Sequence, residues 1–267
     1  MLNESEYFGQ QKLFHGEVPA VLGSKLGALL CDVEESISGQ FWGRLCSICD
    51  EVEAHLNGGN PQSELGRFNS GKMLAHSEVS DCLAAAVDLS KEYLRLTGGL
   101  FDPALGKMNY VDHDEDDGSL SLYGVKLDFG SFAKGYLLRR IQSLLKETGI
   151  TSAFVNLGNY AFLAVGSHPC GEDWKISLSN PYSHMPIEDV PLKDSCLALS
   201  CNAPGASARV IHPKTLKGND ERKMVVVTGT DILDVKVAAT ALMISDEQQV
   251  LGIKRNFPEI ETRFYKL

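Results

Sequence analysis

Apolar residues recur at three- and four-residue spacings early in the chain, as they do on one face of a helix. Within residues 38–56 this face comprises Phe41, Leu45, Ile48, Val52 and Leu56. The pattern ends at residues 57–61, where Asn, Gly and Pro favour a loop. We therefore expect a helix of about five turns in this region.

Two further helices follow from the same periodicity. One is predicted over about 80–97, with Ser80 as the N-cap and the pair Gly98-Gly99 as the stop. Another is predicted over about 131–148 and ends at Gly149.

The pattern changes after Ser152, where β-rich sequence begins. Residues 153–165 are apolar with Gly and Asn interruptions, and residues 174–178 alternate with period two. The remaining predicted elements are strands near 196–200, 207–212 and 223–229, helices near 233–244 and 246–255, and a closing strand near 261–265. No regular βαβ repeat is visible, so the α+β class, as one domain of mixed sheets flanked by helices, fits better than a doubly wound sheet.

The formal net charge of -10 changes the range of functions. Broad binding to nucleic acid or to an anionic membrane needs a basic surface, so both are excluded as main functions. A small anionic ligand would need a local cluster of basic groups, or a metal ion, against this overall field.

Two short patterns that suggest metal sites are better explained structurally. Cys46 and Cys49 form a lone CxxC within a helical pattern, and the seven cysteines are mostly in apolar stretches. The acidic stretch 112–118 has the wrong residues for a calcium loop at its sixth and twelfth positions, so we expect a solvated turn.

Five segments, each weakly specific alone, carry the candidate chemistry. They are residues 63–69 (Ser-Glu-Leu-Gly-Arg-Phe-Asn), 97–106 (Thr-Gly-Gly-Leu-Phe-Asp-Pro-Ala-Leu-Gly), 127–136 (Leu-Asp-Phe-Gly-Ser-Phe-Ala-Lys-Gly-Tyr), 155–158 (Val-Asn-Leu-Gly) and 239–242 (Ala-Thr-Ala-Leu). In this order and spacing they resemble the FAD:protein FMN transferase family, the ApbE-like flavin transferases. The resemblance covers about residues 22–265, so we assign 22–267 to an ApbE-like domain and 1–21 to an N-terminal extension.

The resemblance implies a fold that binds FAD in a cleft, with a divalent metal that helps to split the pyrophosphate. FMN then passes to a threonine or serine hydroxyl of a target protein. The flavin-binding residues it implies are Ser63, Asp102, Lys134, Gly135, Gly158 and Ser200. The metal ligands it implies are Thr240 and Ala133.

Elementary chemistry supports part of this set independently. Residues 128–136 are a strand end, a Gly turn and a helix start, which present backbone N–H groups to an anion. Lys134 then lies either beside a phosphate or on the surface of the helix. Asp102 has two readings as well, a residue of the pocket or a simple turn former.

Two departures from the family pattern affect its chemistry. Lys236 stands four residues before Thr240, where the family has a metal-ligating Asp, and an ammonium has no acceptor for magnesium and repels it. Arg209 stands where the family has a catalytic His, and its guanidinium stays protonated to about pH 12. His212 titrates in the right range, either as a relocated base or as a turn residue before Pro213.

Other departures concern binding. Gly59 replaces a family tyrosine that is available for stacking on the flavin, and Leu199-Ser200-Cys201 replaces Thr-Ser-Gly. Asn159 and Tyr160 replace a Gly and an Asp. So many changes in one pocket suggest a changed activity.

Three functions remain open from the sequence. The first is a flavin transferase with an altered centre, whose catalytic residues are Lys236, Arg209 and His212. The second is a non-catalytic relative that binds a flavin, a nucleotide or another anion, and the third is a protein-interaction module. FAD is the expected ligand and magnesium is not expected.

The location follows from what the sequence lacks. The N-terminus has no signal-peptide pattern and no run of about 18 apolar residues occurs, so the chain as given is expected to be cytoplasmic. Family members are commonly exported and lipid-anchored, so an exported form is expected only if the N-terminus was trimmed.

Overall fold

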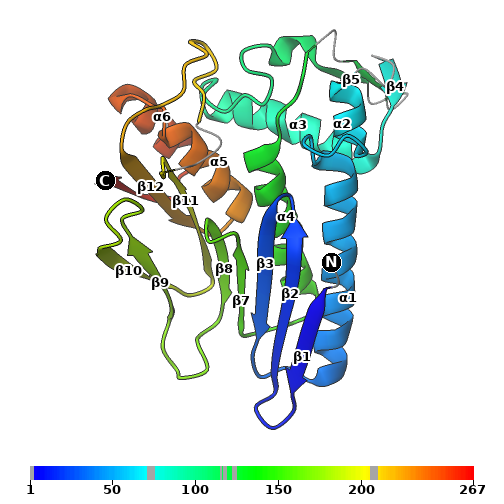
Figure 1. The fold of residues 1–267 in the computed structure, drawn as a ribbon, viewed down its shortest axis with the longest axis vertical. Helices are drawn as coiled ribbons and strands as arrows, with labels where there is room; N and C mark the ends of the chain where they lie inside the picture. The colour runs from blue at the N-terminus through cyan, green and yellow to red at the C-terminus, as the bar shows by residue number, and fades with distance from the viewer. Residues whose placement is uncertain (1–2, 71–75, 115, 117–118, 122–124, 205–209) are drawn as a thin grey trace.

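A computed structural model describes residues 3–70, 76–114, 116, 119–121, 125–204 and 210–267 (Figure 1). Within these ranges, eight strands pair antiparallel in one sheet of order β1-β2-β3-β7-β8-β11-β12-β13. Their bounds are β1 (Glu4–Phe8), β2 (Leu13–Val21), β3 (Ser24–Leu30), β7 (Ala153–Leu157), β8 (Ala161–Val165), β11 (Ser195–Cys201), β12 (Lys223–Gly229) and β13 (Glu261–Lys266).

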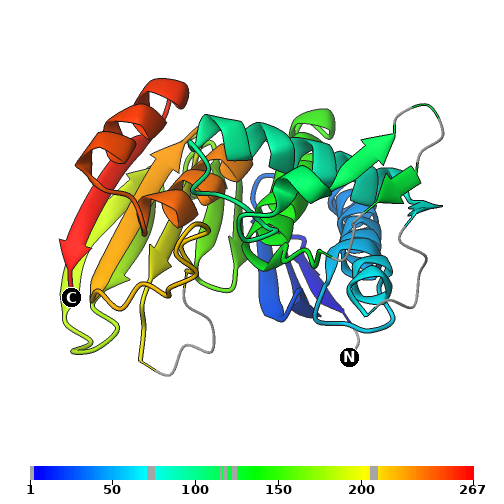
Figure 2. The same cartoon turned by 90° about the horizontal axis from the view of Figure 1, so that it is seen from above.

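Helices cover one face of this sheet. Helices α1 (Glu35–Leu56), α4 (Gly130–Glu147) and α5 (Ile232–Leu242) pack in that order across the face and share one hydrophobic core with it (Figure 2). The other helices are α2 (Glu64–Asn69), α3 (Asp81–Leu96) and α6 (Glu247–Asn256), together with a 3-10 turn at Met108–Tyr110. No described helix has both the length and the apolar character that a membrane span needs.

The opposite face of β8, β11 and β12 is covered by a hairpin of β9 (Trp174–Ser179) and β10 (Pro186–Leu192). On β11, Cys196 and Ala198 join the helix-side core, whereas Leu197 and Leu199 join the hairpin-side core. Successive side chains of a strand point to opposite faces, so this part of the sheet is buried on both sides.

A small sheet of β4 (His76–Glu78), β6 (Ser119–Ser121) and β5 (Asp112–Asp114) stands apart from the main one. The acidic stretch expected to be a turn over 112–118 therefore begins as a strand. Its residues 115 and 117–118 lie outside the described part of the chain.

The α+β class predicted from the sequence is confirmed, and the predicted helices and closing strand lie within a few residues of the observed ones. The pattern missed strands β1 to β6 and β10 and the short helix α2. Residues 4–8 and 13–21, which we had placed in an N-terminal extension, form the first two strands of the main sheet.

The strand expected near 207–212 is not formed in its described part. Residues 210–212 make only an isolated bridge between Ile211 and Gly218, and residues 207–209 are outside the described ranges.

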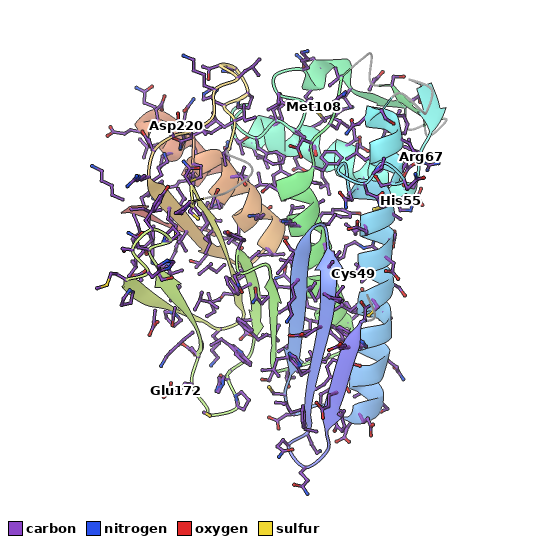
Figure 3. All side chains as sticks on the ribbon, in the orientation of Figure 1. Cys49, His55, Arg67, Met108, Glu172 and Asp220 are labelled. Carbon is purple, nitrogen blue, oxygen red and sulfur yellow. The ribbon has the colours of Figure 1, made fainter. Side chains whose placement is uncertain are left out.

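A network at the end of α1 explains the Ser-Glu-Leu motif. Glu64 is 6% exposed, and its carboxylate accepts hydrogen bonds from His55 Nδ1 at 2.7 Å and from the Ser80 backbone N–H at 2.9 Å. Figure 3 labels His55 beside α2 at this end of the molecule. Ser63 caps α2 by accepting the Gly66 N–H at 2.9 Å. The motif joins α1, α2 and α3.

Candidate active site

A cleft of about 440 Å³ opens where α4 begins and α5 passes the ends of several strands. It receives residues from the β2–β3 turn, from residues 100–105, from the start of α4, from the β7–β8 turn, from β11, from residues 210–213 and from α5. The polar residues of its lining are Asp102, Asp128, Ser131, Lys134, Tyr160, Ser200, Lys236 and Thr240.

The N-terminus of α4 faces this cleft. Phe129 at the N-cap makes no side-chain cap hydrogen bond, and Gly130, Ser131 and Phe132 of the first turn line the cleft. Asp128 Oδ1 accepts the Gly130 N–H at 2.9 Å. The partial positive charge of a helix start favours an anion here.

Lys134 adds a cation one turn into the same helix. Its Nζ donates to Ser24 Oγ at 2.8 Å, so its partner is a neutral hydroxyl. Burial lowers the pKa of Lys134 below its ordinary value. Among the described residues, no carboxylate neutralises this ammonium at the cleft.

Lys236 is the more deeply buried of the two cations, at 8% exposure. Burial, and secondarily the charge of Lys134, lower its pKa to about 8, while the nearby Cys201 acts in the opposite direction. Its ammonium has no hydrogen bond or ion pair with any residue in the described ranges. An unpaired buried charge is costly unless a ligand completes it.

Two hydroxyls connect α4 to α5 beside Lys236. Thr240 Oγ1 donates to the Lys236 carbonyl oxygen at 3.0 Å and lies 2.9 Å from Ser131 Oγ. Because the proton of Thr240 is used on that carbonyl, Ser131 is the donor in the hydroxyl pair.

Asp102 serves both roles that the sequence left open. It lines the cleft, and its two carboxylate oxygens accept the N–H groups of Ala104 and Gly106, each at 2.8 Å. This turn carries left-handed backbone at Leu105 (φ 50°) and Gly106 (φ 83°). Asp102 therefore shapes the wall of the cleft.

Thr240 has hydrogen-bonded oxygens and a cation as its neighbours in the cleft. Both carboxylate oxygens of Asp102 accept backbone N–H groups, Thr240 donates its proton to a carbonyl and keeps its oxygen lone pairs, and the cation Lys236 lies one turn before it on α5. Across the described residues, no group of three or more His, Cys, Asp or Glu is placed to hold a metal ion. Magnesium prefers several oxygen ligands and no nearby cation.

Four residues predicted to bind flavin or metal lie outside the described lining of the cleft. Ser63 caps α2, and Ala133 is fully buried in α4. Gly135 lets α4 approach α5, since a Cβ there would lie 2.9 Å from Leu233 Cδ1. Gly158 occupies the β7–β8 turn with φ 63°. These positions support the architecture that holds the cleft.

His212 is not brought to the described lining of the cleft. Ile211 and Pro213 line the cleft, whereas His212 lines a separate hollow of about 250 Å³ and accepts the Lys214 N–H on Nδ1. Arg209 lies outside the described residues.

Sequence reasoning missed three polar residues of the described cleft lining, namely Asp128, Ser131 and Tyr160. Ser131 lies inside a recognised motif but was not singled out, and its position in the first turn of α4 was the available signal. Tyr160 was noted only as a departure from the family pattern, yet it lines the cleft. Gly59, the other noted departure, lies in the loop before α2 and outside the lining.

The chain resembles known proteins in sequence. A family profile described as the ApbE family matches residues 32–115 and 107–264. A segment of 82 residues is 34% identical to a protein of Klebsiella pneumoniae named FAD:protein FMN transferase. That segment spans 30% of this chain and only 24% of the Klebsiella protein.

Solved structures match nearly the whole fold. The flavin transferase ApbE from Vibrio cholerae superposes with a TM-score of 0.79 at 18% identity, over 94% of this chain and 93% of its own. The ApbE protein of Thermotoga maritima gives a TM-score of 0.78 at 16% identity, over 94% and 96%. The flavinyl transferase ApbE of Pseudomonas stutzeri gives 0.76 at 18%, over 98% and 91%.

Proposed function

Since the chain belongs to the ApbE family, we propose that its cleft binds a flavin nucleotide and that the protein transfers FMN from FAD to a serine or threonine hydroxyl of a target protein. The matched proteins named as flavin transferases support this activity. The observation that carries the proposal is the convergence of the α4 N-terminus with Lys134 and the unpaired Lys236.

In the proposed reaction, the Lys236 ammonium supplies the positive charge at the pyrophosphate. Splitting a pyrophosphate develops negative charge on the departing AMP, and fixed donors aimed at that charge stabilise the transition state. The Lys236 ammonium and the α4 amides are such donors. One ammonium supplies half the charge of a divalent metal, so we expect slow turnover.

The altered centre defines the second half of the proposal, namely that magnesium is not used. A carboxylate at position 236 would complete oxygen ligation beside Thr240, and the ammonium there repels a cation. The same ammonium attracts the pyrophosphate directly.

A second candidate, binding of a flavin nucleotide without transfer, is favoured by the position of His212. The described lining of the cleft contains no histidine, so it offers no neutral imidazole to accept a proton from the target hydroxyl. Transfer would then depend on a base from elsewhere.

AMP release from FAD tests the transferase proposal. Wild type should release AMP slowly, at a rate that magnesium does not change, and Lys236→Met should abolish the release. Lys236→Asp should make the release magnesium-dependent. Strong magnesium-dependent turnover by wild type would overturn the altered-centre proposal.

Thermal shift separates the two candidates. A ligand that binds only the folded state adds about 2.7 kcal/mol of apparent stability at a hundredfold excess over its Kd. A clear shift with FAD, without AMP release in the presence of any acceptor hydroxyl, favours binding alone. The absence of a shift with FAD, FMN, ADP and pyrophosphate would favour a protein-interaction function.

A further inference from the structure

An exposed aromatic ring stands at the wall of the cleft. Tyr160 lies in the turn between β7 and β8 and is 46% exposed, although it lines the same cleft as Lys134 and Lys236. Large aromatic side chains bury much apolar surface when they pack, so one left open in a cleft is available to a ligand.

Its surroundings differ from those of the other rings in this half of the sheet. Phe154 stacks on Trp174 with ring centroids 5.2 Å apart, and on Phe162 at 6.0 Å. The ring of Tyr160 has no aromatic partner, and its hydroxyl no hydrogen bond, among the residues that the structure describes. The fold therefore leaves the ring of Tyr160 available for contact with a ligand.

The backbone that carries Tyr160 is firmly held. Its N–H donates to the Leu157 carbonyl at 3.3 Å, and its carbonyl accepts the Leu199 N–H at 2.9 Å. Asn156 braces the turn by accepting the Asn159 N–H at 3.0 Å and donating to Asn159 Oδ1 at 2.7 Å. A tyrosine so held loses only two side-chain torsions on binding, which makes it a low-entropy contact.

We propose that Tyr160 is a binding residue whose ring stacks on a flat heteroaromatic ring of a phosphate-bearing ligand, while the phosphates lie at Lys134 and Lys236. The inference rests on the proposed function for the identity of the ligand class, a flavin nucleotide. It adds the residue that recognises the ring, as distinct from the lysines that recognise the phosphates.

The size of the effect follows from stacking measured elsewhere. Removing an aromatic ring that stacks on a base weakens binding by about fivefold to a hundredfold. A phenylalanine at this position keeps the ring, so Tyr160→Phe should bind almost as wild type does. The phosphate subsite is separate, so inorganic pyrophosphate should bind equally well to all Tyr160 variants.

The experiment measures the Kd of FMN, ADP and pyrophosphate for wild type, Tyr160→Ala and Tyr160→Phe by titration calorimetry. Phe264→Ala is the matched control, because Phe264 is 47% exposed on β13 and lies outside the cleft. We expect Tyr160→Ala to weaken FMN or ADP by about tenfold, with pyrophosphate unchanged. A loss of affinity for FMN would identify the stacked ring as the isoalloxazine, and a loss of affinity for ADP would identify it as the adenine.

Three results would overturn the inference. They are an unchanged Kd for both nucleotides in Tyr160→Ala, an equal loss for pyrophosphate, and an equal loss in Phe264→Ala. Failure of the proposed function has a different signature. Wild type would then bind no FMN, and Tyr160-dependent binding of ADP would still support a stacking role.

Discussion

The interface between α4 and α5 holds two polar clusters with opposite electrostatics. At the start of α5, Arg139 Nε donates to Asp231 Oδ2 at 2.8 Å, and the Tyr93 hydroxyl donates to Asp234 Oδ1 at 2.5 Å. Asp231 also caps α5 by accepting the N–H groups of Leu233 and Asp234. Each charged group of this first cluster has a hydrogen-bonding partner within the protein.

The second cluster, at the cleft, holds two cations and two hydroxyls: Lys134, Lys236, Ser131 and Thr240. Burial lowers the pKa of both lysines, and the charge of Lys134 lowers the pKa of Lys236 further. Among the described residues, neither lysine has a carboxylate partner, and this contrast with the first cluster supports the proposal that the cleft binds an anion. We therefore expect removal of a partner in the first cluster to lower the free energy of unfolding, and removal of the Lys236 charge in the second cluster to raise it.

The largest expected effect is a gain of stability in Lys236→Met. In the unfolded chain the lysine has its ordinary pKa of 10.5, and in the folded protein its pKa is about 8. Folding thus disfavours the charged form, at a cost of roughly 3 kcal/mol that is fully present below pH 8 and absent above pH 10.5. Lys236→Met should raise the free energy of unfolding by about that amount at pH 7.

Urea unfolding of wild type and variant between pH 6 and pH 10.5 measures this effect. Wild type should gain stability from pH 8 upward, and the difference from Lys236→Met should shrink over the same range. Lys254→Met, at an exposed position of α6, is the control and should show no such difference. A less stable Lys236→Met at pH 7 would mean that a partner compensates the buried ammonium.

Tyr93→Phe should have the opposite sign. The substitution keeps the ring stacked on Phe257, at 6.2 Å between centroids, and removes only the hydroxyl that donates to Asp234. Burial already raises the pKa of Asp234, against the effect of that hydrogen bond. Leaving a half-buried carboxylate short of a donor costs about 1–3 kcal/mol.

Denaturant unfolding at pH 7 checks the loss, and Tyr265→Phe provides a control on a more exposed tyrosine whose hydroxyl also donates to a carboxylate, that of Glu188. A neutral Tyr93→Phe would mean that water or Arg139 replaces the donor, and the contrast between the two clusters would then be weaker than their geometry indicates.

Much of this fold could be read from the sequence, because the helices and the later strands carry regular periodicity and clear stop signals. The sequence pattern did not predict β1, because none of its residues is buried, or β2, because a glycine stands on its buried face and its register shifts between Val18 and Val21. Their place in the main sheet depends on the pairing of β2 with β3 and of β3 with β7, which no local pattern encodes.

The site was predicted only in part, for a similar reason. Motifs identified Lys134, Asp102 and Thr240, and the change at Lys236 was visible as a break in one motif. Which side of the chain His212 faces, and that Tyr160 stands open in the cleft, depend on tertiary packing. In irregular backbone the side-chain directions follow no regular period, so they cannot be predicted from the sequence pattern.

The affinity of the cleft for anions should fall as pH rises. This prediction tests the lysine cluster through ligand binding instead of stability. Lys236, whose pKa is about 8, is charged at pH 7 and largely neutral at pH 9.5. The groups that face it electrostatically are Lys134 and Cys201. We expect the Kd of pyrophosphate to rise by about tenfold over this range, since a hydrogen bond to a charged group contributes about 1.5–3 kcal/mol.

Calorimetry at the two pH values measures the change, and Lys236→Arg separates its source. An arginine stays charged throughout, so the variant should lose most of the pH dependence. Pyrophosphate itself becomes more negative over this pH range, and this change alone would strengthen binding. A loss of affinity at the higher pH must therefore come from deprotonation of an amine of the protein. A pH dependence that persists in Lys236→Arg would assign the effect to Lys134.

The smallest expected effect tests how the packing of α4 on α5 holds the cleft. A Cβ at Gly135 would lie 2.9 Å from Leu233 Cδ1 and 3.2 Å from Lys236 Cβ, so Gly135→Ala must displace one of them. Overpacking costs about 1–3 kcal/mol, and the better helix propensity of alanine offsets up to about 1 kcal/mol of this.

Gly135→Ala should therefore lose about 1 kcal/mol net and weaken pyrophosphate binding, because the displaced helix carries Lys236. Gly43→Ala is the matched control, since Gly43 is also within a helix, α1, and a Cβ there meets nothing within 4 Å. That variant should gain roughly 0.5–1 kcal/mol and bind pyrophosphate as wild type does. Paired denaturant curves and pyrophosphate titrations decide the point: if Gly135→Ala gains stability as Gly43→Ala does and keeps its affinity, α5 yields easily and Lys236 is not held in place by the contact with α4.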